Sequence, residues 1–394
     1  MRILSVVGAR PDFMKLAPIE RALAEHPGVE HDIVHTGQHY DPQMSATIFE
    51  ELWLPVPDHC LGVGSGSHAA QTATVMARLE PVLTASRPDL VLVYGDVNST
   101  LAAALVAAKL GIRVGHVEAG LRSGDRNSPE EINRALTDRL SDLLFVPTRD
   151  ASGHLHTEGV PDDRIHFVGN VMIDSLCWAL ERARERDPAA RHGLDGRPYV
   201  VVTLHRPANV DDPQTLRELL DTLGCLSEAA PVLFPLHPRT RKNVHALGEG
   251  AEREGARRAD LRLLDPLGYM EMLGLVISAA LVITDSGALQ EETTYLGVPC
   301  LTVGPHTERS VTCLHGTNRL VPPRRDVILA AARRALQRRS PARPLIERWD
   351  GRTAERIAQV VCDDACFPDD VEPVVTAPEE PCLIIASPEP AAVI

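Results

Sequence analysis

The chain has 394 residues, 44% of them hydrophobic and 24% charged, and its formal net charge is −14. Its length predicts two domains, its composition is typical of a globular protein, and its negative charge argues against nucleic acid as a partner. No apolar stretch is long enough to cross a bilayer, so we expect no membrane association. The start MRILSVVGARP predicts a strand and contains no small-residue cleavage site, and the eight cysteines are scattered. We therefore expect reduced thiols and a cytoplasmic location.

Apolar, β-branched runs alternate with helical patterns along most of the chain. In the first half, the predicted strands are 3–7, 32–36, 90–94, 114–117, 143–146 and 165–168, and the predicted helices lie around 15–25, 69–85, 98–110 and 129–141. The second half repeats this design with strands at 199–204, 232–236, 261–264, 281–284, 300–303 and 320–321. Such alternation predicts parallel sheets covered by helices on both faces. The predicted fold class is α/β, with two Rossmann-like domains that face each other across a cleft.

The two runs of strands are separated by a polar segment around 182–198, which ends in GLDGRP. We expect an amino-terminal domain at 1–171 and a carboxyl-terminal domain at 172–362, whose last helix, roughly 346–362, can cross back to the first domain. Residues 363–394 contain eight acidic and no basic side chains and six prolines. Such a composition buries too little apolar surface to offset the entropy of ordering, so we expect this tail to be disordered.

The run TDSGALQEE, at 284–292, is the most informative motif. It follows an apolar strand, and Ser286 and Gly287 leave backbone N–H groups free at the start of a helix. Such a helix start binds phosphate through these N–H groups and the positive end of the helix dipole. Glu292, further along the helix, can accept hydrogen bonds from a ribose diol. The motif predicts a nucleotide-diphosphate pocket at the carboxyl end of a strand, although an ordinary Ser/Gly helix start fits it equally well.

Acidic and imidazole side chains occupy strand ends and helix starts. Asp96 and Glu118 each follow a predicted strand, Glu130 and Glu131 lie in the first turn of the helix at 129–141, and His205 ends another strand. Carboxyl ends of parallel strands face the cleft, so these side chains can converge. A helix cap would explain Asp96 alone and a helix dipole Glu130 alone, but the coincidence of several favours a catalytic set.

A second set of side chains is basic. Arg10 and Lys15 lie in GARPDFMKLAP after the first strand, and Arg309 lies in HTERS after the strand at 300–303. Cations that face a phosphate-binding helix start stabilise a departing diphosphate, although each of them could also be a surface cation. The sequence contains no metal-ligand constellation, P-loop or GxGxxG pattern, so we expect no metal and no nicotinamide cofactor.

The motifs identify a family when they are taken together. The chain contains, in this order, GARPDFMKLAP, TGQHYD, VYGDVNST, GHVEAGLRSGD, PEEINR, VGNVMID, LHRPANVDD, TDSGALQEE, LGVPCLTV and HTERSVT…GTNRLV. Over all but the carboxyl-terminal tail, these motifs resemble the non-hydrolysing UDP-N-acetylglucosamine 2-epimerases. The resemblance implies the glycosyltransferase-B architecture, a homodimer, no redox cofactor, and interconversion of UDP-N-acetylglucosamine and UDP-N-acetylmannosamine.

The resemblance also implies a mechanism. UDP is eliminated across carbons 1 and 2, and it adds back to the resulting glycal after protonation from the opposite face, within domains that close around a hinge near 170–174. This chemistry requires two acid–base groups and strong stabilisation of departing UDP. Residues at the family's catalytic positions are Asp96, Glu118, Glu130 and His205, the last of which supports the diphosphate or relays a proton to it. Residues at its nucleotide-contacting positions are Arg10, Lys15, Ser286, Gly287, Glu292 and Arg309.

Three features depart from the usual bacterial pattern. Ala288 follows Ser286 and Gly287 where SGG is usual, and Met272 aligns with an aromatic residue beneath the uracil. LHRPANVDD replaces the HRRESFG loop, a variant shared with branches that act on modified or oxidised sugars. The alternatives are therefore the same chemistry on a UDP-diacetamido-uronate, a hydrolysing epimerase that releases UDP, a glycosyltransferase, and a non-catalytic sugar-nucleotide sensor.

Overall fold

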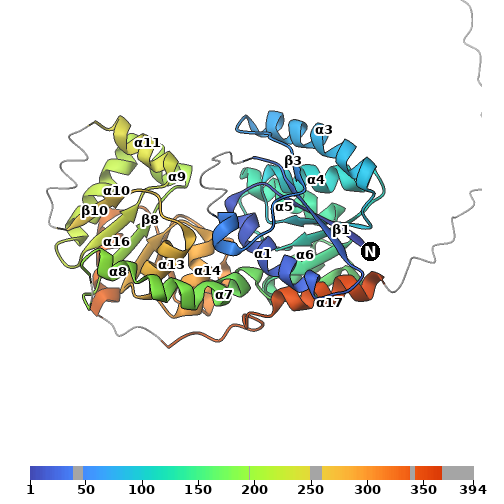
Figure 1. Ribbon diagram of the computed structural model, residues 1–394. Coiled ribbons are helices and arrows are strands. Elements are labelled where there is room, and N and C mark those ends of the chain that lie inside the picture. Colours follow the sequence, from blue (N-terminus) through green and yellow to red (C-terminus); the bar gives the residue numbers. More distant parts are fainter. Residues whose placement is uncertain (39–47, 195, 249–259, 338–341, 366–394) are drawn as a thin grey trace, which may run out of the picture.

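The computed structural model describes residues 1–38, 48–194, 196–248, 260–337 and 342–365. Most of the tail predicted at 363–394 and the end of the TGQHYD motif lie outside these ranges. The rest of the chain forms two α/β domains that lie side by side (Figure 1). This architecture agrees with the two Rossmann-like domains predicted from the sequence.

The amino-terminal domain contains a parallel sheet of seven strands among the described residues. In chain order they are β1 (Arg2–Val7), β2 (Glu30–His35), β3 (His59–Cys60), β4 (Leu90–Tyr94), β5 (Arg113–Val117), β6 (Leu143–Val146) and β7 (Ile165–Phe167). Their spatial order is β3-β2-β1-β4-β5-β6-β7, and every neighbouring pair is parallel. The order reverses between β1 and β4, which is where open α/β sheets form a ligand-binding crevice.

The carboxyl-terminal domain repeats this design with a parallel sheet of six described strands. They are β8 (Val200–Thr203), β9 (Val232–Pro235), β10 (Leu261–Leu264), β11 (Leu281–Thr284), β12 (Cys300–Val303) and β13 (Asn318–Val321). Their spatial order is β10-β9-β8-β11-β12-β13. The order reverses between β8 and β11, so His205 after β8 and Ser286 after β11 lie at a second switch point.

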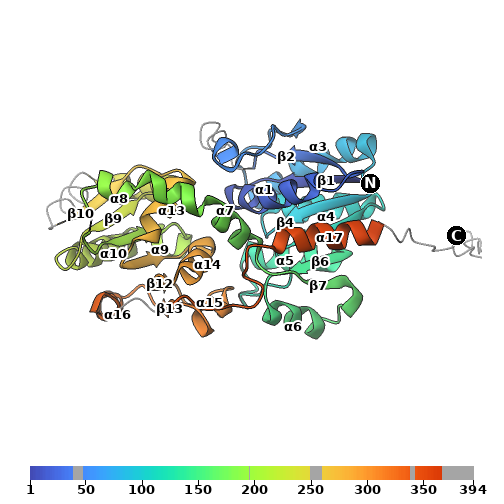
Figure 2. The ribbon, with the colours of Figure 1, turned by 60° about the horizontal axis from the view of Figure 1, so that its bottom comes forward.

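Helices cover both sheets (Figures 1 and 2). The first domain contains α1 (Arg10–Ala24), α3 (His68–Ser86), α4 (Asn98–Lys109), α5 (Pro129–Leu140), α6 (Arg149–Thr157) and the 3₁₀ turn η1 (Asp162–Arg164). The second contains α8 (Pro188–Arg191), α9 (Pro207–Val210), α10 (Pro213–Leu226), α11 (Pro238–Ala246), α13 (Tyr269–Ile277), α14 (Gly287–Leu296), α15 (Ser310–Leu314) and α16 (Arg325–Gln337). Several begin with proline, whose fixed φ and missing N–H suit the first helical position.

Two further helices, α7 (Val171–Arg186) and α17 (Thr353–Ala365), connect the domains. Helix α7 packs against α1 on one side and against α13 and α14 on the other, and α17 lies along α1 and α7 (Figure 2). The buried side chains Leu16, Leu176, Leu273 and Ile357 belong to one apolar cluster that contains residues of both domains. Burial of this continuous apolar surface stabilises the arrangement of the two domains. The division at 171/172 coincides with the start of α7 and stays a prediction.

The predicted strands are all present, each within two residues of its predicted ends. The edge strand β3 was not predicted, because His59 and Cys60 are too few to show a periodic pattern. In the part of the chain that the structure describes, no helix is both long and apolar enough to span a membrane.

Candidate active site

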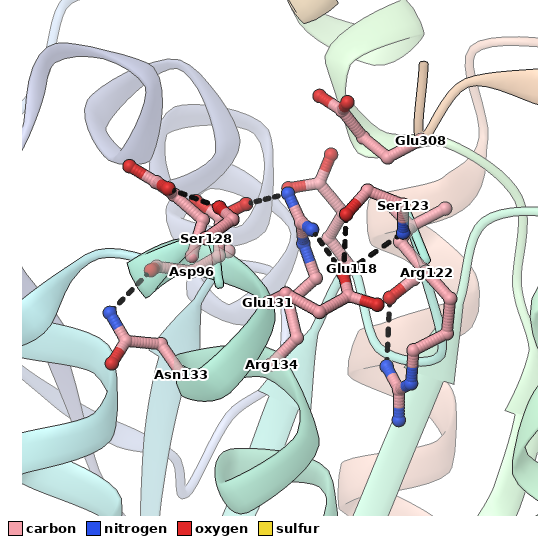
Figure 3. Close-up of polar contacts among 12 residues, drawn as sticks. Asp96, Glu118, Arg122, Ser123, Ser128, Glu131, Asn133, Arg134 and Glu308 are labelled. Atoms are coloured by element: carbon pink, nitrogen blue, oxygen red, sulfur yellow. Dashed lines mark hydrogen bonds and ion pairs between the residues drawn. The ribbon is translucent and has the colours of Figure 1, made fainter. Parts of the chain in front are cut away.

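Asp96 lies at the carboxyl end of β4, beside the switch point of the first sheet. Its carboxylate accepts a hydrogen bond from Arg134 of α5 at 2.5 Å, and its carbonyl accepts one from the Asn133 amide at 2.8 Å. The Asp96 side chain is 26% exposed, so one edge of the carboxylate is open to a ligand. Arg134 also donates to Glu131 at 2.8 Å and thus lies between two carboxylates (Figure 3).

Glu118 follows β5 and has a left-handed backbone conformation, with φ of 77°. Its buried carboxylate contacts Lys15 through one oxygen and Arg309 through the other, the latter at 2.6 Å. Burial raises the pKa of Glu118, but Arg309 and Lys15 lower it further, to about 2. Gly95 leaves room for this contact, since a Cβ there would lie 2.6 Å from the Lys15 ammonium nitrogen. Glu118 is therefore an ionised carboxylate held between two cations.

Glu130 and Glu131 are neighbours in the first turn of α5 but differ in environment. Glu130 is exposed and accepts a hydrogen bond from the Ser128 hydroxyl at 2.6 Å. Glu131 is buried and accepts hydrogen bonds from the backbone N–H groups of Ser123 and Gly124, at 2.9 and 3.2 Å. Burial raises the pKa of Glu131, but the hydrogen bonds from Ser123 and Gly124 lower it below its usual value. Glu131 thus fixes the loop after Glu118, whereas Glu130 is free to meet a ligand.

His205 and Asp285 form an ion pair at the switch point of the second sheet. The His205 Nδ1 atom lies 2.9 Å from the Asp285 carboxylate, which also accepts the backbone N–H groups of His205 and Arg206 and the Asn209 amide. Burial raises the pKa of Asp285, but the contact with His205 lowers it further, below its usual value. The His205 side chain is 37% exposed. A buried carboxylate therefore orients an imidazole whose other edge can reach a ligand.

The start of α14 lies beside Arg309, with Ser286 as its N-cap residue. A Cβ at Gly287 would lie 3.2 Å from the Glu308 carboxylate and 3.5 Å from the Arg309 guanidinium, so glycine keeps the helix start close to both. Arg309 also lies 2.7 Å from the buried Glu291 carboxylate. Glu308 pairs with Arg206 at 2.9 Å and lies above the Asp96 cluster in Figure 3. A phosphate at this helix start would meet both N–H groups and a guanidinium.

Glu292 is buried on the next turn of α14. Burial raises its pKa from the usual 4.5 to about 8, and neither the Tyr269 hydroxyl nor Arg10 reverses this shift. Burial also lowers the pKa of Arg10, while Glu51 and Glu292 raise it. At neutral pH Glu292 is thus a carboxylic acid, which can both donate to and accept from a diol.

The described residues contain no group of three or more His, Cys, Asp or Glu side chains arranged to hold a metal ion. What the structure brings together is a set of carboxylates from the first domain and a helix start with an arginine from the second. The contact between Glu118 and Arg309 joins the two sets. This arrangement suits proton transfer beside a phosphorylated leaving group.

Comparisons with known proteins agree with this chemistry. A family model described as UDP-N-acetylglucosamine 2-epimerase matches residues 21–362. A homologue of that enzyme from Methanococcus maripaludis is 43% identical over 333 residues, which are 84% of this chain and 91% of the relative. The UDP-2,3-diacetamido-2,3-dideoxy-D-glucuronate 2-epimerase of Pseudomonas aeruginosa is 42% identical over 341 residues, which are 85% of this chain and 92% of that protein. The chain belongs to the UDP-N-acetylglucosamine 2-epimerase family.

A solved member of the UDP-N-acetylglucosamine 2-epimerase family has the same fold. The Methanocaldococcus jannaschii enzyme, crystallised with UDP-GlcNAc and UDP, superposes with a TM-score of 0.85 and 38% identity, covering 92% of this chain and all of that one. The family and the two-domain architecture predicted from the sequence are thus confirmed.

In this member of the epimerase family, the predicted site residues lie at the facing ends of the two sheets. The structure joins Lys15 and Glu118 to Arg309 and places Gly287 beside Arg309. It leaves Glu130 exposed at the edge of the cluster. Their catalytic and binding roles stay predictions.

Two residues of this epimerase site were absent from the predicted set. Asp285 directly follows β11, the neighbour of the strand that precedes His205, so the position itself was a signal. Glu308 stands next to Arg309 in HTERS, but no pattern indicates that it pairs with Arg206.

Proposed function

We propose that this chain catalyses the reversible epimerisation of UDP-N-acetylglucosamine at carbon 2, giving UDP-N-acetylmannosamine through elimination and re-addition of UDP. The single observation that carries the proposal is the contact between Glu118 of the first domain and Arg309 of the second. It brings a carboxylate suited to proton transfer next to a helix start suited to a diphosphate. Membership of the family supports the same substrate.

The proposed elimination uses both sets of side chains. A carboxylate among Asp96, Glu118 and Glu130 takes the proton from carbon 2, and the electrons of that C–H bond form the double bond between carbons 1 and 2. The bond from carbon 1 to the UDP oxygen breaks, and its electron pair leaves on UDP. In the return step, a second acid protonates carbon 2 from the opposite face while the UDP oxygen adds to carbon 1. The sequence is redox-neutral and consumes no co-reactant.

The proposed nucleotide site lies on the second domain. The backbone N–H groups at Ser286 and Gly287 bind the diphosphate, and Arg309 balances the charge that develops on the leaving oxygen. His205, oriented by Asp285, supports the diphosphate or passes a proton to it. Protonated Glu292 binds the ribose diol. Two cations of the first domain, Arg10 and Lys15, complete the site.

We further propose the domain limits 1–171 and 172–362, a homodimer and a cytoplasmic location. Ile132 and Leu136 lie one turn apart on α5 and are each 48% exposed, which gives the first domain an apolar patch that a second copy could cover. Sedimentation measurements on the purified chain test the dimer.

A second candidate substrate is a UDP-diacetamido-uronate. It is favoured by the 42% identity to the Pseudomonas aeruginosa enzyme of that name, which is nearly equal to the 43% found for the Methanococcus maripaludis homologue. Comparing kcat/KM for the two sugar nucleotides decides between them.

The direct test is to incubate the purified chain with UDP-N-acetylglucosamine and to follow the products by proton NMR. The proposal predicts that the manno epimer accumulates to a constant ratio with intact UDP. Steady release of UDP and free sugar would instead identify a hydrolysing epimerase, and transfer to an added acceptor sugar would identify a glycosyltransferase. Tight binding without any turnover would leave a sugar-nucleotide sensor.

A further inference from the structure

His116 is a fully buried histidine of β5 that takes no part in the chemistry described above. Its Nε2 atom lies 2.7 Å from the carbonyl oxygen of Gly95, at the end of the neighbouring strand β4. Its Nδ1 atom lies 2.6 Å from the carboxylate of Asp138 on α5, which is 1% exposed. One imidazole thus joins two strands and a helix beneath the candidate active site.

The hydrogen-bond partners fix where the protons of this pair lie. A carbonyl oxygen can only accept, so the Nε2 atom of His116 must donate to Gly95. The Asp138 carboxylate also accepts the backbone N–H of Gly120 at 3.1 Å and pairs with Arg122 at 2.8 Å. One further proton is therefore shared between His116 and Asp138, and no neutral rearrangement of the ring satisfies both ends at once without it.

The two ends of this pair bind the backbone beside the two buried acids of the site. Gly95 immediately precedes Asp96, and Gly120 is the second residue after Glu118. Gly95 and Gly120 have φ angles of 61° and 77°, conformations that these turns adopt readily only with glycine. Each turn is flexible by composition, and each receives a hydrogen bond from the same buried pair.

Helix α5 provides the third point of attachment. Arg134 and Asp138 are one turn apart and project from the same face of the helix, as their spacing of four residues requires. Arg134 donates to the Asp96 side chain at 2.5 Å, while Asp138 accepts from Gly120 and bonds to His116. The carboxylate of Asp96 and the backbone next to it are therefore referenced to one rigid helix.

We propose that His116 and Asp138 are positioning residues, which hold the turn before Asp96 and the turn after Glu118 at the spacing that epimerisation requires. This inference rests on the proposed function. Neither residue needs to touch the substrate, because both act through backbone groups next to residues that do. A displacement of about 1 Å in a catalytic group can lower the rate about 10²-fold, so loss of this bracing is measurable.

A matched pair of variants separates the two ends of the imidazole. His116→Gln places an amide nitrogen near the position of Nε2 and keeps a donor for the Gly95 carbonyl. His116→Asn places an amide near the position of Nδ1, keeps the contact with Asp138 and loses the one with Gly95. Both substitutions remove the ring and its charge, so they differ chiefly in the hydrogen bond that holds the Asp96 turn.

A third variant, Asp138→Asn, tests geometry against charge. An asparagine oxygen can accept from Gly120 and Arg122 while its nitrogen donates to a neutral His116 ring, whose Nε2 atom still donates to Gly95. All the hydrogen bonds survive in this variant, although the carboxylate charge is gone. If the pair acts through geometry, this variant keeps most of the wild-type rate.

The experiment measures kcat and KM for epimerisation, UDP affinity by calorimetry, and the thermal midpoint for each variant beside the wild type. We expect kcat to fall about 10²-fold in His116→Asn and about tenfold or less in His116→Gln and Asp138→Asn, with KM and UDP affinity within about threefold of wild type, because the nucleotide binds the other domain. Equal losses in the two His116 variants, a normal kcat in His116→Asn, or a parallel loss of folding and UDP affinity would each overturn the proposal. Absence of epimerisation by the wild type would instead overturn the proposed function.

Discussion

The Nη2 atom of Arg309 lies 2.6 Å from the Oε1 atom of Glu118, so a single buried ion pair joins the two domains at the candidate site. Lys15 contacts the other oxygen of the same carboxylate. A diphosphate bound at Ser286 would compete for Arg309 and Lys15 and so weaken their hold on Glu118. We therefore expect nucleotide binding to raise the pKa of Glu118 from about 2 and to turn a structural ion pair into a proton acceptor.

Glu118→Gln should remove this switch. We expect kcat to fall by at least about 10²-fold, because a group that transfers a proton is lost, while UDP affinity is unchanged or stronger. The matched control is Glu347→Gln, which breaks an exposed ion pair with Arg149 and should leave kcat unchanged. Steady-state kinetics and calorimetry check both. A kcat near the wild-type value in Glu118→Gln would remove this residue from the mechanism.

Asp96→Asn should also lower kcat by at least about 10²-fold, since the amide cannot take a proton from carbon 2. Arg134 loses one charged acceptor in this variant but keeps Glu131. Asp142→Asn is the control, because Asp142 bonds the Val114 N–H at 2.8 Å near the opposite edge of the same sheet. If the two variants lose equal activity, the effect is one of folding and Asp96 has no special role.

Gly95→Ala should damage the site more than the fold. A Cβ there would lie 2.6 Å from the Lys15 nitrogen, so Lys15 must move away from Glu118. Gly111→Ala is a matched control, because Gly111 also has a positive φ, of 70°, but no atom lies within 4 Å of the added Cβ. Both variants should lose about 1–2 kcal/mol of unfolding free energy from the strained backbone. Only Gly95→Ala should lose epimerisation, and equal activity of the two would contradict the role of this contact.

Glu292 should make the unliganded protein less stable as the pH rises. Its pKa is raised from 4.5 to about 8 on folding, so between these values the folded state holds a proton that the unfolded state has released. Unfolding free energy from this group is therefore full below pH 4.5 and is lost as the pH rises through the folded pKa. Glu292→Gln should remove this loss, so its thermal midpoint relative to wild type should increase between about pH 5 and about pH 8. A difference that stays constant over this range would show that Glu292 is ionised in the folded protein.

The strands and their order along the chain could be predicted because each buried parallel strand is a short apolar run bounded by polar residues or glycine. The strands at Leu90–Tyr94, Leu281–Thr284 and Cys300–Val303 coincide with the predicted ranges. Residues at their carboxyl ends could then be predicted as site residues, since the topology collects those ends at one edge. This reasoning gave Asp96 and His205 without any knowledge of the side-chain contacts.

The environment of individual side chains could not be predicted in the same way. Glu130 and Glu131 are adjacent and equally acidic, yet successive residues of a helix point in different directions. Which of them is buried depends on the loop that brings the N–H groups of Ser123 and Gly124 over α5. The contact of Glu118 with Arg309 likewise joins residues far apart in sequence and depends on how the two domains pack.

The central claim is that a proton leaves carbon 2 of the sugar and a different one returns while UDP is detached. Epimerisation in deuterium oxide, followed by NMR and mass spectrometry, tests this most directly. The account predicts UDP-N-acetylmannosamine that carries one solvent deuterium at carbon 2. An epimer without solvent deuterium at that carbon, or no epimer at all, would contradict it.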